Sequence, residues 1–395
     1  MGPDRQLRRL ILRTLLPSFP GHTAPEWALR LTGEGIGGWV LFGYNIESSA
    51  QVAGLTAQVR AAHPEVLLAL DEEGGDVTRL AHTVGSPYPG NAALGAVNDI
   101  AVTEHIYRCI GLELAAAGIN LDLAPTLDVN VEDDNPVIGT RSFGADPLLV
   151  AAHAAAAVAG LQSVGVAACA KHFPGHGATA TDSHLGLPTV DVGIDVLWER
   201  ELPPFAAAVK AGTKSIMTAH IRVPALTGDL PATFSRRVLV DLLRKELGFT
   251  GCLITDALEM QGAAALTGGV PGAAVASLAA GADLLCLGAE IDEELVEATI
   301  AELAAAVGDG RLPLARLEEA AARVDALAAS AHPVYETAAL AVSGPGYDAA
   351  LRAIRLEGTL PVLDDALIVQ VESESSIAAG PVPWGLGAHT PLPVT

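Results

Sequence analysis

One short segment of the chain carries most of the side chains that could perform acid–base chemistry. The sequence KHFPGHG at residues 171–177 is followed by TDSH at residues 181–184. The apolar run 166–170 precedes both and predicts a buried strand. A cation and three imidazoles beside a core strand cost free energy unless they have partners, so the segment is a candidate site. Its polar and ionisable members are Lys171, His172, His176, Thr181, Asp182 and His184.

Three further segments place carboxylates and guanidinium groups after apolar runs. DEEGG begins with Asp71 and is followed by Arg79, NPVIGTRSFG contains Arg141, and TDALEM contains Asp256. A carboxylate at a strand end can hold sugar hydroxyls or attack an anomeric carbon, and glycines let the backbone approach a ligand. Taken singly, each segment also has an ordinary interpretation: an acidic turn, a loop-bracing arginine, and a carboxylate that caps the next helix.

Eight apolar runs of strand length alternate with helical patterns, and these elements must position the polar groups. Near-continuous apolarity predicts strands buried on both faces, and helical crossovers predict parallel pairing. We therefore expect an α/β fold of the (β/α)8 TIM-barrel type, with a doubly wound open sheet as the alternative. The predicted strands are residues 10–16, 36–42, 66–71, 119–124, 166–172, 215–220, 252–256 and 282–287, and the predicted helices are residues 25–32, 50–62, 100–117, 147–163, 195–211, 236–247, 273–280 and 293–307.

Charged and imidazole side chains recur at one end of the predicted strands. In a (β/α)8 barrel the active site is built at the C-terminal face, from strand ends and the loops that follow them. A purely structural explanation would have to account for charges placed repeatedly at the same end. The residues concerned are Asp71, Asp122, Lys171, His172, His220 and Asp256.

The pattern changes after residue 330. Residues 346–357 predict one helix and residues 366–372 one strand, before a loop that contains Gly and Pro. One strand cannot form a stable sheet alone. We expect a catalytic barrel over residues 1–335 and, over residues 336–395, a C-terminal tail that resembles the start of an incomplete second α/β domain or that packs on the barrel.

Composition argues against two classes of partner. The formal net charge of −23 would repel phosphate backbones and anionic membranes, so we expect neither nucleic-acid nor membrane binding. No run approaches the roughly 18 apolar residues of a membrane span, and Pro17 ends the N-terminal apolar run too early for a signal peptide. The four cysteines have no paired spacing, which indicates free thiols in a reducing compartment and a cytoplasmic location.

Taken together, the segments are more specific than any one of them. DEEGG, NPVIGTRSFG, KHFPGHG, DSH and TDALEM occur in that order at barrel-like spacing, within roughly residues 10–330. The chain resembles the bacterial β-N-acetylglucosaminidases of glycoside hydrolase family 3. The most specific part of the resemblance is KHFPGHG together with DSH.

The resemblance implies a retaining exo-glycosidase that removes terminal β-linked N-acetylglucosamine, with cell-wall (peptidoglycan) fragments as the expected source. Asp256 would be the nucleophile that forms a covalent glycosyl-enzyme, and His184, supported by Asp182, would be the acid/base. The small carbohydrate substrate is the expected partner, with no cofactor and no metal. The residues implied to hold the sugar are Asp71, Arg79, Arg141, Lys171 and His172, whereas His176 would brace the loop.

Elementary chemistry agrees with these implied roles. A retaining glycosidase needs a nucleophile about 5 Å from a group that protonates the leaving oxygen and then activates water. Histidine titrates near neutral pH and can serve both steps, and a neighbouring carboxylate would fix its tautomer. The chain has Glu72 and Asp76 where relatives often carry Gln and Arg, a departure that concerns the loop more than the chemistry.

Four other functions use the same residues. The histidines and Asp182 could bind zinc, although Pro174 and Gly175 prevent the regular helix that the spacing of His172 and His176 would need. A phosphorylase is a closer alternative, because a histidine acid/base does not repel an incoming phosphate. A β-glucosidase and a non-catalytic sugar-binding barrel complete the set.

Overall fold

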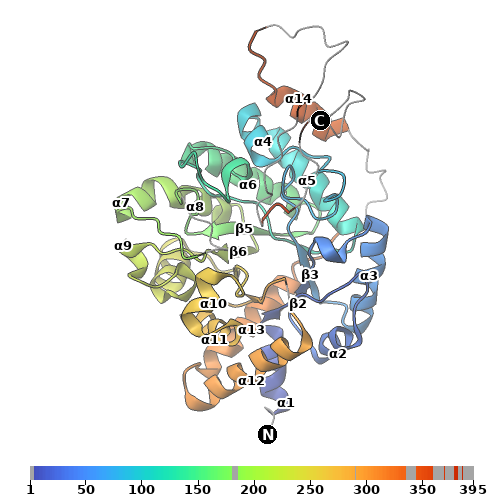
Figure 1. Cartoon of the computed structure of the whole chain (residues 1–395), viewed down its shortest axis with the longest axis vertical. Coiled ribbons are helices and arrows are strands. Elements are labelled where there is room, and N and C mark those ends of the chain that lie inside the picture. Colours follow the sequence, from blue (N-terminus) through green and yellow to red (C-terminus); the bar gives the residue numbers. More distant parts are fainter. Residues whose placement is uncertain are drawn as a thin grey trace.

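The computed structural model describes residues 4–179, 186–289, 291–334, 344–358 and 378–380, together with residues 369 and 385. Within these residues, strands lie near the centre of the molecule and helices surround them (Figure 1). The α/β fold predicted from the alternation of strands and helices is therefore confirmed. The strands are parallel wherever they pair, as the helical crossovers predict.

Each predicted strand run contains or overlaps one strand of the structure. Strands β2 to β7 form a six-stranded parallel sheet in sequence order, and β1 pairs with β8 in a second, two-stranded sheet. The strands are β1 (Leu15–Leu16), β2 (Gly38–Val40), β3 (Leu67–Leu70), β4 (Leu121–Asp122), β5 (Ala167–Phe173), β6 (Ser215–Thr218), β7 (Cys252–Thr255) and β8 (Leu285–Cys286).

Several hydrogen bonds join the two sheets, among them those from the Asp283 N–H to the Leu253 carbonyl at 2.8 Å and from the Thr255 N–H to the Leu284 carbonyl at 3.0 Å. An isolated parallel bridge pairs Ile254 of β7 with Leu284, the residue before β8. On the other side, the Val40 N–H of β2 donates to the Pro17 carbonyl, just after β1, at 2.9 Å. The fold is thus a curled parallel sheet, in which strands distant in sequence have their C-terminal ends on the same side.

The first predicted strand run is wrong over most of its length. Residues 10–13 belong to helix α1 (Arg5–Arg13), and only Leu15–Leu16 form a strand. The Asp4 carboxylate caps this helix by accepting the Leu7 N–H at 2.8 Å. Arg8 pairs with Glu34 and Glu297 on neighbouring helices. The cap at Asp4 and the ion pairs of Arg8 therefore favour a helix that continues through residues 10–13, where the apolar pattern predicted a strand.

Helices cover the outer face of the curled sheet, close to the predicted positions. The long helices after α1 are α2 (Glu26–Glu34), α3 (Ser49–Ala62), α5 (Ile100–Ala116), α6 (Pro147–Gln162), α8 (Leu202–Lys210), the π-helix η5 (Arg237–Glu246), α11 (Val270–Ala280), α12 (Glu293–Asp309) and α13 (Leu314–Ala328). The short ones are η1 (Gly43–Asn45), α4 (Asn91–Val97), η2 (Gly139–Arg141), α7 (Ile194–Val196), the π-helix η3 (Leu197–Glu201), α9 (Pro224–Thr227), η4 (Ala232–Phe234) and α10 (Gln261–Thr267).

Side chains of the strands alternate between two apolar clusters. In β3, Leu68 and Leu70 belong to the larger cluster, which packs against the helices, while Leu67 and Ala69 belong to a smaller one that also includes residues of α13. Side chains point alternately to the two faces of a strand, so both faces are buried. This explains the near-continuous apolar runs. All four cysteines are free, as expected.

Part of the C-terminal tail packs on the sheet-and-helix unit. Helix α14 (Gly344–Ala353) contacts α4 and α5 (Figure 1), slightly ahead of the predicted helix at residues 346–357. Apart from Val369, the strand predicted at residues 366–372 lies outside the described residues. Among the described helices, none alone has the length and apolarity to cross a membrane; one bent pair, Gln261–Thr267 with Val270–Ala280, meets the length and composition test jointly.

Candidate active site

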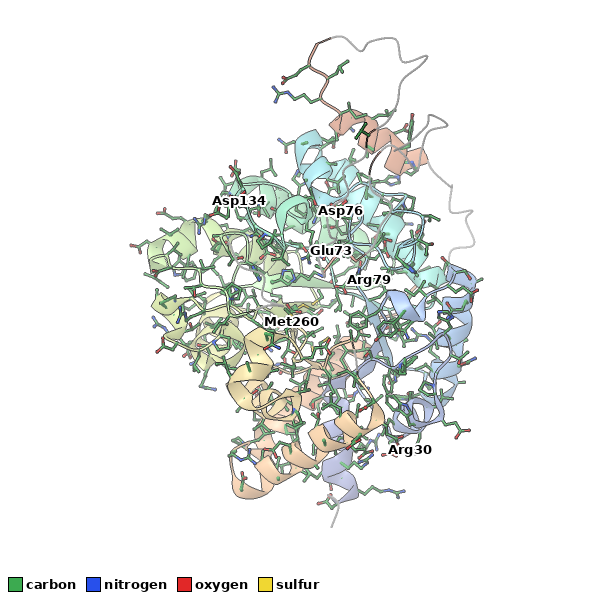
Figure 2. The ribbon with its side chains drawn as sticks, viewed as in Figure 1. Arg30, Glu73, Asp76, Arg79, Asp134 and Met260 are labelled. Carbon is green, nitrogen blue, oxygen red and sulfur yellow. The ribbon has the colours of Figure 1, made fainter. Side chains whose placement is uncertain are left out.

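A pocket of about 270 Å³ lies at the C-terminal ends of the strands. Its floor is apolar, with Val40, Leu123, Met217 and Cys286 from four strand ends or the residues after them. All six described residues predicted for the site line it: Asp71, Arg79, Arg141, Lys171, His172 and Asp256. In Figure 2 the labelled Arg79 and Met260, which also line it, lie near the middle of the molecule, and Arg30 lies near its edge.

The predicted acid/base pair, His184 and Asp182, lies outside the described residues, as does Thr181. The described chain reaches Thr179 on one side and resumes at Gly186 on the other. The sugar-holding part of the predicted site and its nucleophile are therefore the parts whose geometry follows below.

Lys171 is the central cation of the pocket. Its Nζ lies 2.7 Å from Asp71 Oδ1 and 2.7 Å from Glu73 Oε1, and the residue is 1% exposed. Burial alone would lower the pKa of Lys171, but the charges of the two carboxylates raise it above its usual value. Burial likewise opposes ionisation of Asp71, yet Lys171 and Arg79 lower its pKa below the usual range. The pocket thus presents a charged ammonium beside a charged carboxylate.

Glu73 is a site residue that the sequence did not single out. Its carboxylate accepts two hydrogen bonds from Arg141, from Nη2 at 2.7 Å and from Nε at 3.0 Å, and one from Thr126 Oγ1 at 3.0 Å. Burial would raise the pKa of Glu73, but Arg141 and Lys171 depress it far below its usual value. Glu73 therefore fixes Arg141 and Lys171 at the pocket wall. Glu73 is the third residue after β3 (Leu67–Leu70), within DEEGG, and this position was the sequence feature that could have pointed to it.

His172 is held by a second residue that the sequence did not single out, Asp128. The Nδ1 atom of His172 lies 2.7 Å from Asp128 Oδ2, and the carboxylate is fully buried. The other ring nitrogen, Nε2, lies 3.5 Å from Arg141 Nη2. Asp128 lies beyond the predicted strand that ends at Ala124, so no strand-end pattern pointed to it.

His176 also lines the pocket, and contacts within the loop hold it there. Its backbone N–H donates to Asp128 Oδ1 at 2.6 Å, its carbonyl accepts from Asn135 Nδ2 at 3.0 Å, and its Nδ1 lies 2.8 Å from Thr179 Oγ1. Burial lowers the pKa of the His176 imidazole to about 4, so the ring is neutral at pH 7. These contacts agree with the loop-bracing role expected for it.

Asp256 follows the last residue of β7 and lines the pocket. Its Oδ1 accepts the Ala257 N–H at 2.8 Å, which orients the carboxylate. Helix α10 begins at Gln261 with Met260 as its N-cap residue. The alternative in which Asp256 caps the next helix is therefore wrong, and its carboxylate lies half-buried at the strand tip, in the pocket.

Arg79 reaches both the pocket and the C-terminal tail. Its Nη2 lies 3.5 Å from Asp71 Oδ2 and donates to the Ala378 carbonyl at 2.8 Å, while Nη1 donates to the Ala379 carbonyl at 3.3 Å. Ala378, Ala379 and Gly380 themselves line the pocket. The sequence prediction did not foresee that a segment some 300 residues away would form part of this wall.

The sequence over the sheet and its helices matches a known family. Residues 11–327 match the model described as "Glycosyl hydrolase family 3 N terminal domain". The chain belongs to glycosyl hydrolase family 3. The predicted family is thereby confirmed, on a match that spans every strand of the curled sheet.

Two curated relatives carry hexosaminidase names. The family 3 chain is 34% identical over 384 residues to "Beta-hexosaminidase A" of Pseudoalteromonas piscicida, which covers 88% of this chain and 64% of that protein. It is 37% identical over 297 residues to "Beta-hexosaminidase" of Nitrosomonas eutropha, covering 73% of this chain and 84% of that protein. The chain thus spans slightly less than two thirds of the first relative's length.

Two solved structures share the fold of this chain. A family 3 β-N-acetylglucosaminidase from a Paenibacillus species superposes with a TM-score of 0.86 at 36% identity, covering 98% of this chain and 78% of that one. A β-N-acetylhexosaminidase from Beutenbergia cavernae gives a TM-score of 0.73 at 30% identity, covering 82% of this chain and 98% of that one.

The two departures noted for this family 3 chain have structural roles in loops. Glu72 is buried, and its Oε2 accepts the N–H groups of Arg79 and Leu80 at 2.9 and 3.0 Å. Burial raises the pKa of Glu72 to about 7. Asp76 accepts a short hydrogen bond from the Thr140 hydroxyl and so ties this turn to η2. Both effects concern the loop rather than the reacting groups, as expected.

Two other strand-end residues of the family 3 chain, Asp122 and His220, are not part of the pocket lining. Asp122 accepts the Glu72 N–H at 3.0 Å, and burial raises the pKa of its fully enclosed carboxyl well above the usual value. His220 lies against Thr233 Oγ1 and the Ala257 carbonyl, at 2.9 and 3.0 Å. Neither lines the pocket. Among the residues described, no group of three or more His, Cys, Asp or Glu side chains could hold a metal ion.

Proposed function

We propose that this family 3 chain hydrolyses terminal β-linked N-acetylglucosamine with retention of configuration. The position of Asp256 carries the proposal: its carboxylate lines one pocket with the Asp71–Lys171 pair. Carboxylate–cation pairs at the end of a small pocket suit vicinal sugar hydroxyls, which both donate and accept hydrogen bonds. The hexosaminidase names of the relatives support the substrate class.

In the proposed first step, the Asp256 carboxylate attacks the anomeric carbon while His184 donates a proton to the departing glycosidic oxygen. The bond to the aglycone breaks and a glycosyl–Asp256 ester forms. In the second step, His184 takes a proton from water, whose oxygen attacks the same carbon and releases Asp256. Asp182 would hold the histidine in the required tautomer, as the carboxylate of a catalytic triad does.

The proposed sugar contacts come from the pocket wall. Asp71 Oδ2 and the Lys171 ammonium would bind neighbouring hydroxyls, because each is charged and already oriented by its partner. Arg141 and His172, held by Glu73 and Asp128, would bind from the adjacent side. Arg79 would bind the sugar only through N–H groups that do not already donate to the Ala378 and Ala379 carbonyls.

Four further statements about the whole chain belong to the proposal. The Val40–Pro17 and Ile254–Leu284 contacts support a closed eight-stranded (β/α)8 barrel. We assign residues 1–335 to this catalytic unit and residues 336–395 to a C-terminal tail. Cell-wall fragments as the substrate source and a cytoplasmic location remain predictions from the sequence.

The test is release of chromophore from an aryl β-N-acetylglucosaminide compared with the matching β-glucoside. We expect a clear preference for the N-acetylglucosaminide, and Asp256→Asn should lower kcat by about 10⁴-fold or more. His184→Ala should be rescued in part by leaving groups that need no proton. Faster turnover of the glucoside would overturn the substrate, and an active Asp256→Asn variant would overturn the nucleophile.

Running the same assay with and without phosphate separates hydrolysis from phosphorolysis. The proposal expects free N-acetylglucosamine as the product under both conditions. A glycosyl phosphate that appears only with phosphate would instead establish the phosphorylase. Sugar binding without turnover of any glycoside, unaffected by Asp256→Asn, would establish the non-catalytic barrel.

A further inference from the structure

Asp128 is a buried carboxylate with three hydrogen-bond donors. Its Oδ2 lies 2.7 Å from His172 Nδ1. Its Oδ1 accepts the backbone N–H of His176 at 2.6 Å and that of His172 at 3.3 Å. The side chain has no exposed surface. All three hydrogen bonds found among the described residues come from the strand end and loop that follow Ala170.

These contacts require acceptors on both oxygens of the Asp128 side chain. Burial would raise the pKa of Asp128, but His172 and the hydrogen bonds from His172 and His176 lower it below the usual value. An ionised carboxylate has only acceptors, so it suits three donors at once. The proton of the His172 ring must consequently lie on Nδ1 in either the neutral or the charged imidazole.

The far side of the same ring faces the pocket. The Nε2 atom lies 3.5 Å from Arg141 Nη2, and a guanidinium offers only donors. A neutral ring with its proton on Nδ1 presents a lone pair at Nε2, which agrees with that neighbour. His172 is 6% exposed, so it has little freedom to choose another orientation.

We propose that Asp128 is a positioning residue that fixes the tautomer and orientation of His172 and anchors the start of the loop at His176. The kinetic part of this inference rests on the proposed function, because His172 is taken to contact the sugar. The structural part does not, since the tautomer of His172 exists without substrate. Nothing in the sequence pattern assigned a role to Asp128.

Asparagine cannot replace Asp128 in this arrangement. If its amide oxygen faces His172, its NH2 group meets the backbone N–H of His176. If the amide is reversed, the NH2 group faces Nδ1 and moves the ring proton to Nε2. The first orientation sets one donor against another at the substituted amide, and the second sets the new Nε2–H against the Arg141 guanidinium. A carboxylate-to-amide change of this kind produces the wrong histidine tautomer in catalytic triads.

The first experiment reads the tautomer directly, without substrate. The protein is labelled with ¹⁵N-histidine, and the His172 resonances are assigned by their loss in His172→Gln. We expect the wild-type ring to be protonated at Nδ1 near pH 7.5, with or without a second proton. In Asp128→Asn we expect the neutral Nε2–H form. A wild-type ring with a bare Nδ1 would overturn the inference, whether or not the variant folds.

The second experiment is a double-mutant cycle on kcat/KM. If Asp128 acts through His172, Asp128→Asn should lower kcat/KM roughly 10- to 100-fold in the wild type, and by less than about threefold in the His172→Ala background. Equal effects in the two backgrounds would contradict it. Asp241→Asn, at an exposed surface pair with Lys245, is the control and should change neither kinetics nor the NMR spectrum of His172.

The two failures are distinguishable. If the wild type turns over no glycoside while Nδ1 of His172 is protonated, the proposed function fails and the positioning role stands. If the enzyme is active while Nδ1 is bare, the positioning role fails alone. Thermal melts of each variant separate a local change of tautomer from loss of the fold.

Discussion

Lys171 and Asp71 form an ion pair of 2.7 Å between non-adjacent strands. Lys171 lies in β5 and Asp71 follows β3, with β4 between them in the sheet. The long lysine side chain therefore reaches past β4 to a carboxylate that follows β3. Because it also contacts Glu73 at 2.7 Å, one buried ammonium compensates two carboxylates that would otherwise repel each other.

Replacing this ammonium should cost stability in a pH-dependent way. Lys171→Met leaves Asp71 and Glu73 with less compensation, and breaking a buried pair costs roughly 3–5 kcal/mol. Both carboxyls have depressed pKa values, so their stabilising contribution is present above their unfolded-state pKa. The deficit of the variant should thus be full at pH 7 and smaller at pH 3, because the contribution of the two carboxylates is lost as the pH falls below their ordinary pKa values of 3.8 and 4.5.

Urea unfolding of Lys171→Met at the two pH values measures this deficit. Lys245→Met is the matched control, because Lys245 pairs with Asp241 at the exposed surface and should give no measurable change. A deficit that does not depend on pH would show that lost packing, rather than lost charge, explains the effect.

Glu201 should make the protein less stable as the pH rises from 4.5 to about 7. It is 1% exposed, and its Oε2 has no hydrogen-bond partner among the described residues. Burial, opposed by Arg200, raises the pKa of Glu201 from 4.5 to about 7. The unfolded chain then loses its proton first, so stability falls between pH 4.5 and 7. Relative to Glu201→Gln, the wild type should lose up to roughly 3 kcal/mol over that range.

The measurement is the difference in unfolding free energy between wild type and Glu201→Gln at pH 4.5, 6 and 8. Groups common to both proteins cancel in this difference. If the difference is constant across the three pH values, Glu201 titrates normally, which would contradict its enclosure beneath Gly175.

Gly177 should tolerate no side chain. A Cβ there would lie 2.0 Å from the Val129 carbonyl oxygen, a backbone atom that cannot move aside as a side chain can. Overpacking of this kind costs typically 1–3 kcal/mol. Because Gly177 lies in the loop that leads to the predicted acid/base, Gly177→Ala should also lower kcat. Gly193→Ala, which meets nothing within 4 Å, is the control and should melt and react as the wild type does.

Arg79 should affect both sugar binding and the tail. Arg79→Met removes a cation beside Asp71 and the two hydrogen bonds to Ala378 and Ala379. We expect a higher KM, with a smaller change in kcat, and faster hydrogen exchange in the peptide that contains residues 378–380. Arg30→Met, in a half-exposed ion-pair cluster, should do neither. Unchanged exchange would mean that the carbonyl contacts do not hold the tail in solution.

The fold class could be predicted from local pattern, because strands buried on both faces must be apolar along their whole length. Each of the eight runs contains or overlaps a strand. The first run misled over residues 10–13, since Asp4 and the partners of Arg8 favour a helix there. The capping residue Asp4 lies before the run of residues 10–16. The ion-pair partners of Arg8 lie up to 289 residues away, so the pattern within the run could not predict either contact.

The sequence by itself determined the family 3 membership and the residues at or just after strand ends, such as Asp71, Lys171 and Asp256. The C-terminal ends of parallel strands lie on the same face of the fold. Residues at these ends are therefore expected to lie close together, whichever strand they belong to. Only the tertiary structure decided which residues hold them. Glu73, Asp128 and the Ala378–Ala379 carbonyls act across 68, 44 and about 300 positions of sequence. Which residue pairs with a buried charged group depends on distance and charge in the folded protein, and the spacing of residues along the sequence does not show this.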